Sequence, residues 1–153
     1  MPTPSSLPAL PIRLECVSWR LVQHHLRFEA LRFDAEAQAY LNALQAADDD
    51  SFFCLATNTD DAIEVIGMTH YRLTGDDLYF EHVVVREAFR QREVGRRMLT
   101  EVVSHPTCLR VGRIHWSCPA NDGSGLVRHL AWLRDHTPRL CGTSFALVVA
   151  APG

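Results

Sequence analysis

The stretch at residues 78–103, LYFEHVVVREAFRQREVGRRMLTEVV, decides the fold. Its first part, 78–85, is rich in β-branched and aromatic residues and predicts a strand. From residue 94 to 104 the apolar residues recur at helical spacing, which predicts a helix with Met98 and Leu99 turned inward. A helix that starts directly after a strand presents unpaired backbone N–H groups at the positive end of its dipole. The segment therefore predicts an anion site suited to a phosphate or diphosphate.

The charge pattern supports this interpretation. Residues 86–97 hold five Arg and two Glu, a local charge of +3 in a chain whose net charge is −3. Gly95 would let the backbone approach an anion closely, because it has no Cβ. A solvated, arginine-rich helix end is the alternative interpretation of the same residues.

The apolar periodicity in the rest of the chain predicts the other elements. Short polar turns join the strands at 51–57, 63–73 and 78–85 into antiparallel hairpins. The resulting order, β-α-α-β-β-β-α-β-α-β, predicts an α/β fold with a central mixed, mostly antiparallel sheet and helices on both faces. The remaining predicted strands are 11–17, 111–117 and 143–150. The first predicted helix covers 19–33, and a second begins after its cap at Asp34. The third covers 94–104, and the fourth runs from Asn121 or Asp122 to about His136.

Length and composition exclude several classes. The 153 residues fit a single domain, predicted at 12–153 behind a flexible, proline-rich lead at 1–11. A net charge of −3 argues against a nucleic-acid partner, and no apolar run approaches the roughly 20 residues that span a bilayer, so no membrane partner is expected. The five cysteines form no C-x-x-C pair, so no metal is expected and the chain is expected to be cytoplasmic. All 15 basic residues are Arg.

The element order and the loop after the fourth strand together resemble the GNAT family of acyl-coenzyme A-dependent N-acyltransferases. The signature of this family, [Q/R]-x-x-G-x-[G/A], is matched by Arg90 and Gly95 in the run RQREVG, at the family's spacing from Val85. The sequence departs from the pattern at Glu93, which stands in place of the first Gly, and at Ala88, which stands where Pro is frequent.

The resemblance implies a reaction and a co-substrate. The co-substrate would be acetyl-CoA or another acyl-CoA, and a small-molecule or peptide amine would attack the thioester directly. Most simply the protein would be an N-acetyltransferase. The residues that the resemblance assigns to coenzyme binding are Val83, Val84, Val85, Arg90, Gln91, Arg92, Val94, Gly95, Arg96 and Asn121.

The catalytic residues follow from the same resemblance. Family members often place a general base on the fourth strand, where Glu81 shares the alternation of Val83 and Val85, whereas His82 would face the other way. The tyrosine that usually protonates the leaving thiolate is replaced here by Arg128 and His129. His129 is therefore the expected substitute proton donor.

Three further questions stay open. A GNAT-like fold that has lost its chemistry and serves as a binding or regulatory module is the alternative function, motivated by Glu93 and the missing tyrosine. The acceptor is not readable, although acidic turns at 48–50, 60–61 and 76–77 would favour a cationic amine if they rim its cleft. The apolar last strand is a candidate edge for a homodimer.

Overall fold

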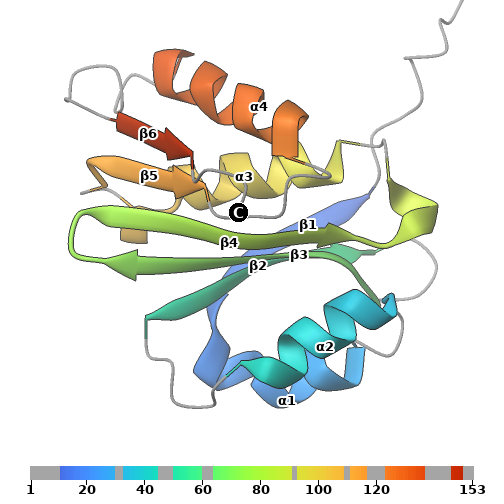
Figure 1. Cartoon of the computed structure of the whole chain (residues 1–153). Helices are drawn as coiled ribbons and strands as arrows, with labels where there is room; N and C mark the ends of the chain where they lie inside the picture. Colours follow the sequence, from blue (N-terminus) through green and yellow to red (C-terminus); the bar gives the residue numbers. More distant parts are fainter. Residues whose placement is uncertain are drawn as a thin grey trace, which may run out of the picture.

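The computed structural model describes residues 11–29, 33–44, 50–59, 64–90, 93–108, 111–116, 123–136 and 146–149. Six strands form one sheet in the order β1-β2-β3-β4-β5-β6, and the predicted order of elements is confirmed (Figure 1). Strands β1 to β4 are antiparallel neighbours, while β5 and β6 are added in parallel. The strands are β1 (Ile12–Ser18), β2 (Ser51–Asn58), β3 (Glu64–Thr74), β4 (Asp77–Val85), β5 (Arg113–Trp116) and β6 (Ala146–Val149), and the helices are α1 (Trp19–Glu29), α2 (Ala35–Ala43), α3 (Val94–Ser104) and α4 (Gly123–His136).

The end of the first helix differs from the prediction. The periodicity predicts a helix to residue 33, but α1 is described over Trp19–Glu29 and Phe33 is no longer helical, while residues 30–32 lie outside the described residues. Phe33 continues the apolar pattern for another reason, because it is buried in the core beneath α1 and α2. The predicted cap of the next helix is confirmed, since the Asp34 side chain accepts a hydrogen bond from the backbone N–H of Ala37. None of the described helices is long and apolar enough to cross a membrane.

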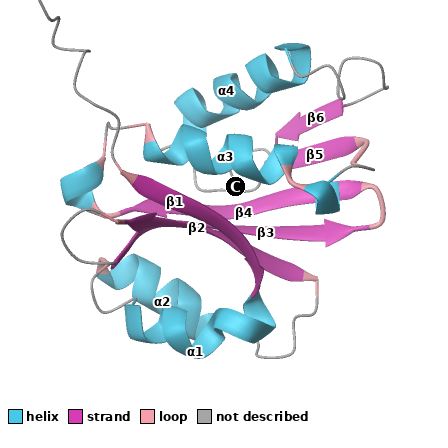
Figure 2. Cartoon of the chain, turned by 180° about the vertical axis from the view of Figure 1, so that it is seen from behind, coloured by secondary structure: helices cyan, strands magenta, loops and turns pink. Residues whose placement is uncertain are grey.

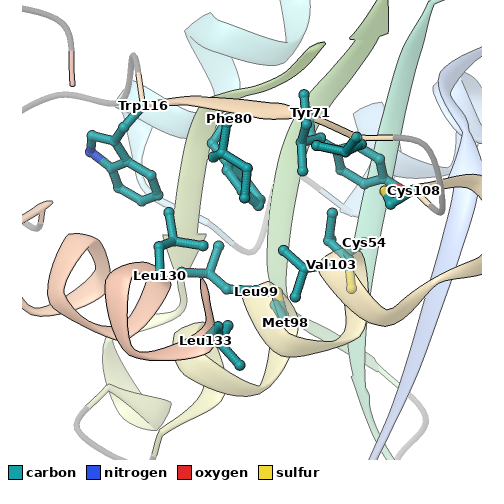
Figure 3. Close-up of a cluster of buried hydrophobic side chains, with 14 of the residues drawn as sticks. Cys54, Tyr71, Phe80, Met98, Leu99, Val103, Cys108, Trp116, Leu130 and Leu133 are labelled. Atoms are coloured by element: carbon teal, nitrogen blue, oxygen red, sulfur yellow. The ribbon is translucent and has the colours of Figure 1, made fainter. Parts of the chain in front are cut away.

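The sheet separates two cores. Helices α1 and α2 cover one face and helices α3 and α4 cover the other (Figure 2). On the α1–α2 face the core is built around Trp19, Leu26, Leu41 and Phe53. On the α3–α4 face buried side chains from the sheet pack against those of both helices and of the short turn after α3 (Figure 3): Cys54, Tyr71, Phe80, Met98, Leu99, Val103, Cys108, Trp116, Leu130 and Leu133. Full burial of a large apolar side chain contributes about 1.5–3 kcal/mol, so both faces hold the sheet in place.

A β-bulge in β4 prepares the site. Tyr71 of β3 pairs with Phe80, but His70, the preceding residue, pairs with His82, so Glu81 is an extra residue on β4. The bulge reverses the alternation: Phe80 and, beyond the bulge, Val83 both belong to the α3 side. Strand β5 pairs with β4 only as far as Phe80. The last part of β4 therefore runs on beyond the described end of its parallel neighbour.

Candidate functional site

A hollow of about 510 Å³ lies where β4 ends and α3 begins, and we call it the α3 hollow. All of the predicted coenzyme-binding residues that the structure describes line it. Gln91, Arg92 and Asn121 lie outside the described residues. Phe89, Glu93 and Leu126 also line it, although the sequence pattern did not assign them to the site. The full lining is Val83, Val84, Val85, Phe89, Arg90, Glu93, Val94, Gly95, Arg96 and Leu126.

Glu93 adopts a backbone conformation that explains the glycine of the family motif. Its φ is 63° and its ψ is 15°, the left-handed region, and no other non-glycine among the described residues has a positive φ. A side chain in this conformation costs roughly 1–2 kcal/mol. The Glu93 side chain is 71% exposed and its carboxylate lies 3.7 Å from the Arg96 guanidinium. The carboxylate therefore stands at the rim and leaves the hollow open.

Two glycines allow the start of α3 to sit close to its neighbours. A Cβ on Gly67 of β3 would lie 3.0 Å from Val94 Cγ1 and 3.1 Å from Met98 Cε. A Cβ on Gly95 would lie 3.2 Å from Leu126 Cδ2 on α4. The sequence predicts that Gly95 admits an anion, and the structure adds that Gly95 makes room for α4. Close packing thus fixes the first turn of α3 beside the end of β4.

Arg90 connects the hollow to the other side of the sheet. Its Nε donates a hydrogen bond to the carbonyl oxygen of Val85, at 3.0 Å, and its Nη2 lies 3.5 Å from Asp34 Oδ2 at the start of α2. A second hollow of about 630 Å³, the α2 hollow, opens beside this pair. Both hollows therefore meet at Arg90 and the end of β4. The lining of the α2 hollow is Phe33, Asp34, Val84, Val85, Arg86, Glu87, Ala88 and Arg90.

Glu81 does not lie where simple strand alternation places it. Alternation groups Glu81 with Val83 and Val85, but the bulge inserts Glu81 as an extra residue and removes that relation. Its carboxylate lies 4.0 Å from the guanidinium of Arg72, and its side chain is 26% exposed. The described lining of neither hollow includes Glu81. Its role as general base stays a prediction, and the bulge corrects the expectation that it shares the alternation of Val83 and Val85.

His129 lies on the contact between α3 and α4. Its Nε2 is 2.9 Å from Thr100 Oγ1, and the Thr100 hydroxyl donates to the carbonyl oxygen of Arg96, so the imidazole Nε2–H donates to Thr100. Burial, and next the charge of Arg96, lower the pKa of His129. A third hollow of about 410 Å³, the α4 hollow, is lined by Arg96, Gly125, Arg128, His129 and Trp132. The structure therefore places His129 in the α4 hollow and Glu81 outside it, and the proton-donor role of His129 stays a prediction.

The α1–α2 face carries a polar network that sequence patterns did not find. Tyr40 of α2 places its hydroxyl 2.5 Å from His70 Nδ1, and His70 Nε2 lies 3.0 Å from Ser51 Oγ. The ring of His82 stacks on Tyr40 with centroids 4.0 Å apart. Burial, followed by the charges of Arg72 and His82, lowers the pKa of His70 to about 4. Because these residues are far apart along the chain, no short sequence motif could predict their contacts.

The acidic turns are engaged with local partners. Asp50 binds Arg72 at 2.7 Å, which holds the pKa of that carboxyl below its usual range. Asp77 lies 2.9 Å from His115 and 3.0 Å from Arg113. The hydrogen bond with His115 is the main cause that lowers the pKa of Asp77. Neither carboxylate lines a hollow described above, and residues 48–49 and 60–61 lie outside the described residues. Within the described ranges no group of three or more His, Cys, Asp or Glu side chains is placed to hold a metal ion.

Comparisons with known proteins bear on this site. A model of the acetyltransferase (GNAT) family matches residues 16–130. No curated protein matches the chain. Among solved structures, a ribosomal-protein-alanine N-acetyltransferase from Brucella melitensis biovar Abortus 2308 is similar with a TM-score of 0.59 and 11% identity, covering 78% of this chain and 90% of that one.

Two other acetyltransferase structures have the same fold. An aminoglycoside N-acetyltransferase in complex with CoA has a TM-score of 0.54 and 14% identity, covering 81% of this chain and 88% of that one. Glucosamine-6-phosphate N-acetyltransferase from Arabidopsis thaliana has a TM-score of 0.51 and 12% identity, covering 76% of this chain and 90% of that one. At these identities the similarity establishes the fold and leaves the substrate undetermined.

Proposed function

This chain belongs to the acetyltransferase (GNAT) family, and on that premise we propose that it transfers an acyl group, most simply acetyl, from a coenzyme A thioester to an amine. The observation that carries the proposal is the open α3 hollow. It joins the end of β4 to the first turn of α3, and its lining contains Arg90, Gly95 and Arg96. A helix start with arginine beside it is a favourable place for a diphosphate.

The residues present fit coenzyme A. The volume of about 510 Å³ lies within the range of small-molecule sites. Glu93 is the one acidic residue in the described lining, and it leans toward Arg96 at the rim. The backbone of Val83 to Val85, past the end of the β5 pairing, would hold the extended arm. When bound, coenzyme A supplies an acyl group activated as a thioester.

The α4 hollow extends this binding surface. It adjoins the α3 hollow at Arg96, which lines both, and it adds the guanidinium of Arg128 and the 54% exposed ring of Trp132. A cation beside an aromatic face suits a phosphorylated nucleoside. We assign the nucleotide end of the coenzyme to the α4 hollow. His129 lies in this hollow, so the proposal does not use it as a proton donor. A weaker affinity for 3′-dephospho-CoA than for CoA would support this assignment.

The acceptor amine is proposed to enter through the α2 hollow. Asp34 and Glu87 offer carboxylates to a cationic amine in this hollow, which Arg86 and Arg90 also line. An ammonium must lose a proton before its nitrogen can attack. We propose that Glu81, at the bulge of β4, accepts this proton directly or through a water molecule. A bulge is a common device for redirecting a side chain near an active site.

The test combines binding and turnover. At one hundred times its Kd, acetyl-CoA should raise the Tm by roughly 5–10 °C. Arg90→Glu should abolish the shift. Arg13→Glu, which reverses a similarly exposed arginine on β1, should leave it intact. Release of free thiol is then measured with a panel of small amines. The chain has no lysine, so self-acylation of an amine can occur only at the α-amino group. An unmoved melting curve at saturating acetyl-CoA would contradict the proposal.

A binding or regulatory module is the second candidate, and two observations favour it. Glu93 places a carboxylate at the rim of the α3 hollow, and the position of the usual catalytic tyrosine is occupied by Arg128 and His129. This candidate predicts a thermal shift with acetyl-CoA but no thiol release with any amine. Turnover above the solvent hydrolysis rate with one amine would eliminate it.

A further inference from the structure

Two cysteines face each other across the outer strand pair of the sheet. Cys16 of β1 lies directly opposite Cys54 of β2 in the antiparallel register. Both belong to the α3 side, because Cys54 lies in that core and Cys16 packs against it. Residues opposite each other in such a pair have Cα atoms about 4.5–5.5 Å apart, which is within the range that a disulfide bridges. Both residues are free thiols in this structure.

We propose that Cys16 and Cys54 form an oxidation site, at which a peroxide converts the two thiols into a cross-strand disulfide. The pair is chemically asymmetric. Cys16 is half-buried on the edge strand, whereas Cys54 is 0% exposed. A peroxide therefore reaches Cys16 first, and Cys54 is the thiol behind it.

The surroundings of the two thiols favour the same order of events. The hydrogen bond from the Cys54 thiol is the main cause that lowers the pKa of Cys16, and the Tyr71 hydroxyl acts in the same direction. Burial and the Glu101 carboxylate oppose this change. The hydrogen bond to Cys16 and burial raise the pKa of Cys54. The thiolate is the reactive form, so Cys16 attacks and Cys54 resolves.

The two steps balance as follows. The Cys16 sulfur attacks one oxygen of hydrogen peroxide, the O–O bond breaks, and Cys16 becomes a sulfenic acid while one water leaves. The Cys54 sulfur then attacks the Cys16 sulfur, the S–O bond breaks, and the S–S bond forms with release of a second water. Two thiols lose two electrons and two protons to one peroxide. A dithiol reductant reverses the change.

A third thiol provides an internal competitor. Cys108 is buried in the same core, and Figure 3 shows it with Cys54 and Tyr71 in that cluster. It follows α3 in the 3-10 turn η4 (Pro106–Cys108), so no strand register aligns it with Cys16. The proposal therefore commits to the pair Cys16–Cys54. The bond would fasten β1, which is the edge of the described sheet, to its neighbour β2.

The chain is well suited to a peptide-mapping test. Cleavage after arginine places each of the five cysteines in a separate peptide, so every pairing gives a distinct linked mass. The folded protein is treated with hydrogen peroxide, alkylated and digested without reductant. We expect peptides 14–20 and 33–72 to be linked as the main oxidised product, with a loss of two hydrogens that dithiothreitol reverses. The other cysteine peptides are 98–110, 114–128 and 140–153.

Variants assign the roles. Cys16→Ser should abolish the linked product, and Cys108→Ser, a matched buried control, should keep it. In Cys54→Ser, Cys16 should be trapped as a sulfenic acid by dimedone. The proposal is overturned if the folded wild-type protein gives no 14–20/33–72 link, if another pairing dominates, or if the link forms only in denaturant. These readouts require no acetyl-CoA, so their failure is distinct from a failure of the proposed function.

Discussion

On the α3–α4 face of the sheet, Arg90 and Arg96 stand half-exposed around an open hollow, whereas on the α1–α2 face His70 and Ser51 are buried and bound to each other. The first face leaves charged side chains and main chain open at the hollow. The second face uses its polar groups to fix α2 on the sheet through Tyr40. The comparison teaches that one face leaves its polar groups open around a hollow, whereas the other uses its polar groups to hold a helix against the sheet.

The largest expected effect is that of a substitution at Glu81, which lies at the bulge of β4. Glu81→Gln removes the proposed proton acceptor while keeping the size and polarity of the side chain. We expect kcat to fall by about 10²–10⁴, the usual contribution of general acid–base catalysis, with an unchanged thermal shift from acetyl-CoA. Steady-state thiol release measures the first effect and differential scanning fluorimetry the second.

The matched control is Glu36→Gln, which removes an exposed carboxylate from the first turn of α2. It should leave kcat within about twofold of the wild type, as expected for a surface substitution. If Glu81→Gln behaves like this control, another group takes the proton. Glu81 would then not be the general base of the proposed reaction.

His70 gives the next largest effect, on the closed face. Its folded pKa is about 4, below the ordinary 6.5, so the unfolded chain takes up a proton first as the pH falls. The stability that neutral His70 contributes is full above pH 6.5 and is lost progressively toward pH 4. Complete loss amounts to roughly 3 kcal/mol. Urea unfolding at several pH values measures it.

Two variants isolate this residue from the carboxylates that also titrate in acid. His70→Gln should flatten the free energy of unfolding between pH 6.5 and 4 relative to the wild type. His25→Gln, on the exposed side of α1, should retain the wild-type slope. Equal slopes for all three proteins would mean that the network does not hold His70 neutral. The polar network would then not fix α2 on the sheet in the way that the comparison of the two faces assumes.

The two faces also differ in how far the sequence predicted them. Local periodicity found α3 with its correct bounds, and a short motif located the α3 hollow, because a strand end and the following helix start are neighbours in the chain. The bulge at Glu81 breaks the alternation without any local signal, so the alternation that grouped Glu81 with Val83 and Val85 does not hold. The contact of Tyr40 with His70 joins residues 30 apart, and only the folded register brings them together.

Glu93→Gly tests the open face with a smaller effect. Glycine relieves the positive φ, worth about 1–2 kcal/mol, but it also increases the entropy of the unfolded chain. We expect a net gain in stability of roughly 0.5–1 kcal/mol and up to about fivefold tighter binding of acetyl-CoA. Glu93→Gln separates the two causes, because it keeps the strain and removes the charge. It should tighten binding without stabilising the fold, and a destabilised Glu93→Gly variant would contradict the assigned strain.

The smallest expected effect is that of a substitution at Asp34, which lies where the two faces meet. Its Oδ1 caps α2 and its Oδ2 faces Arg90, so a substitution must separate the two roles. Asn is an equally good cap, so Asp34→Asn should leave the Tm unchanged, whereas Asp34→Ala should lose about 1 kcal/mol. If a cationic acceptor enters through the α2 hollow, Asp34→Asn should raise its KM by up to about fivefold at low salt, with kcat preserved. An unchanged KM for cationic amines would show that the acceptor does not reach Asp34, and the α2 hollow would then belong to the scaffold rather than to the binding surface.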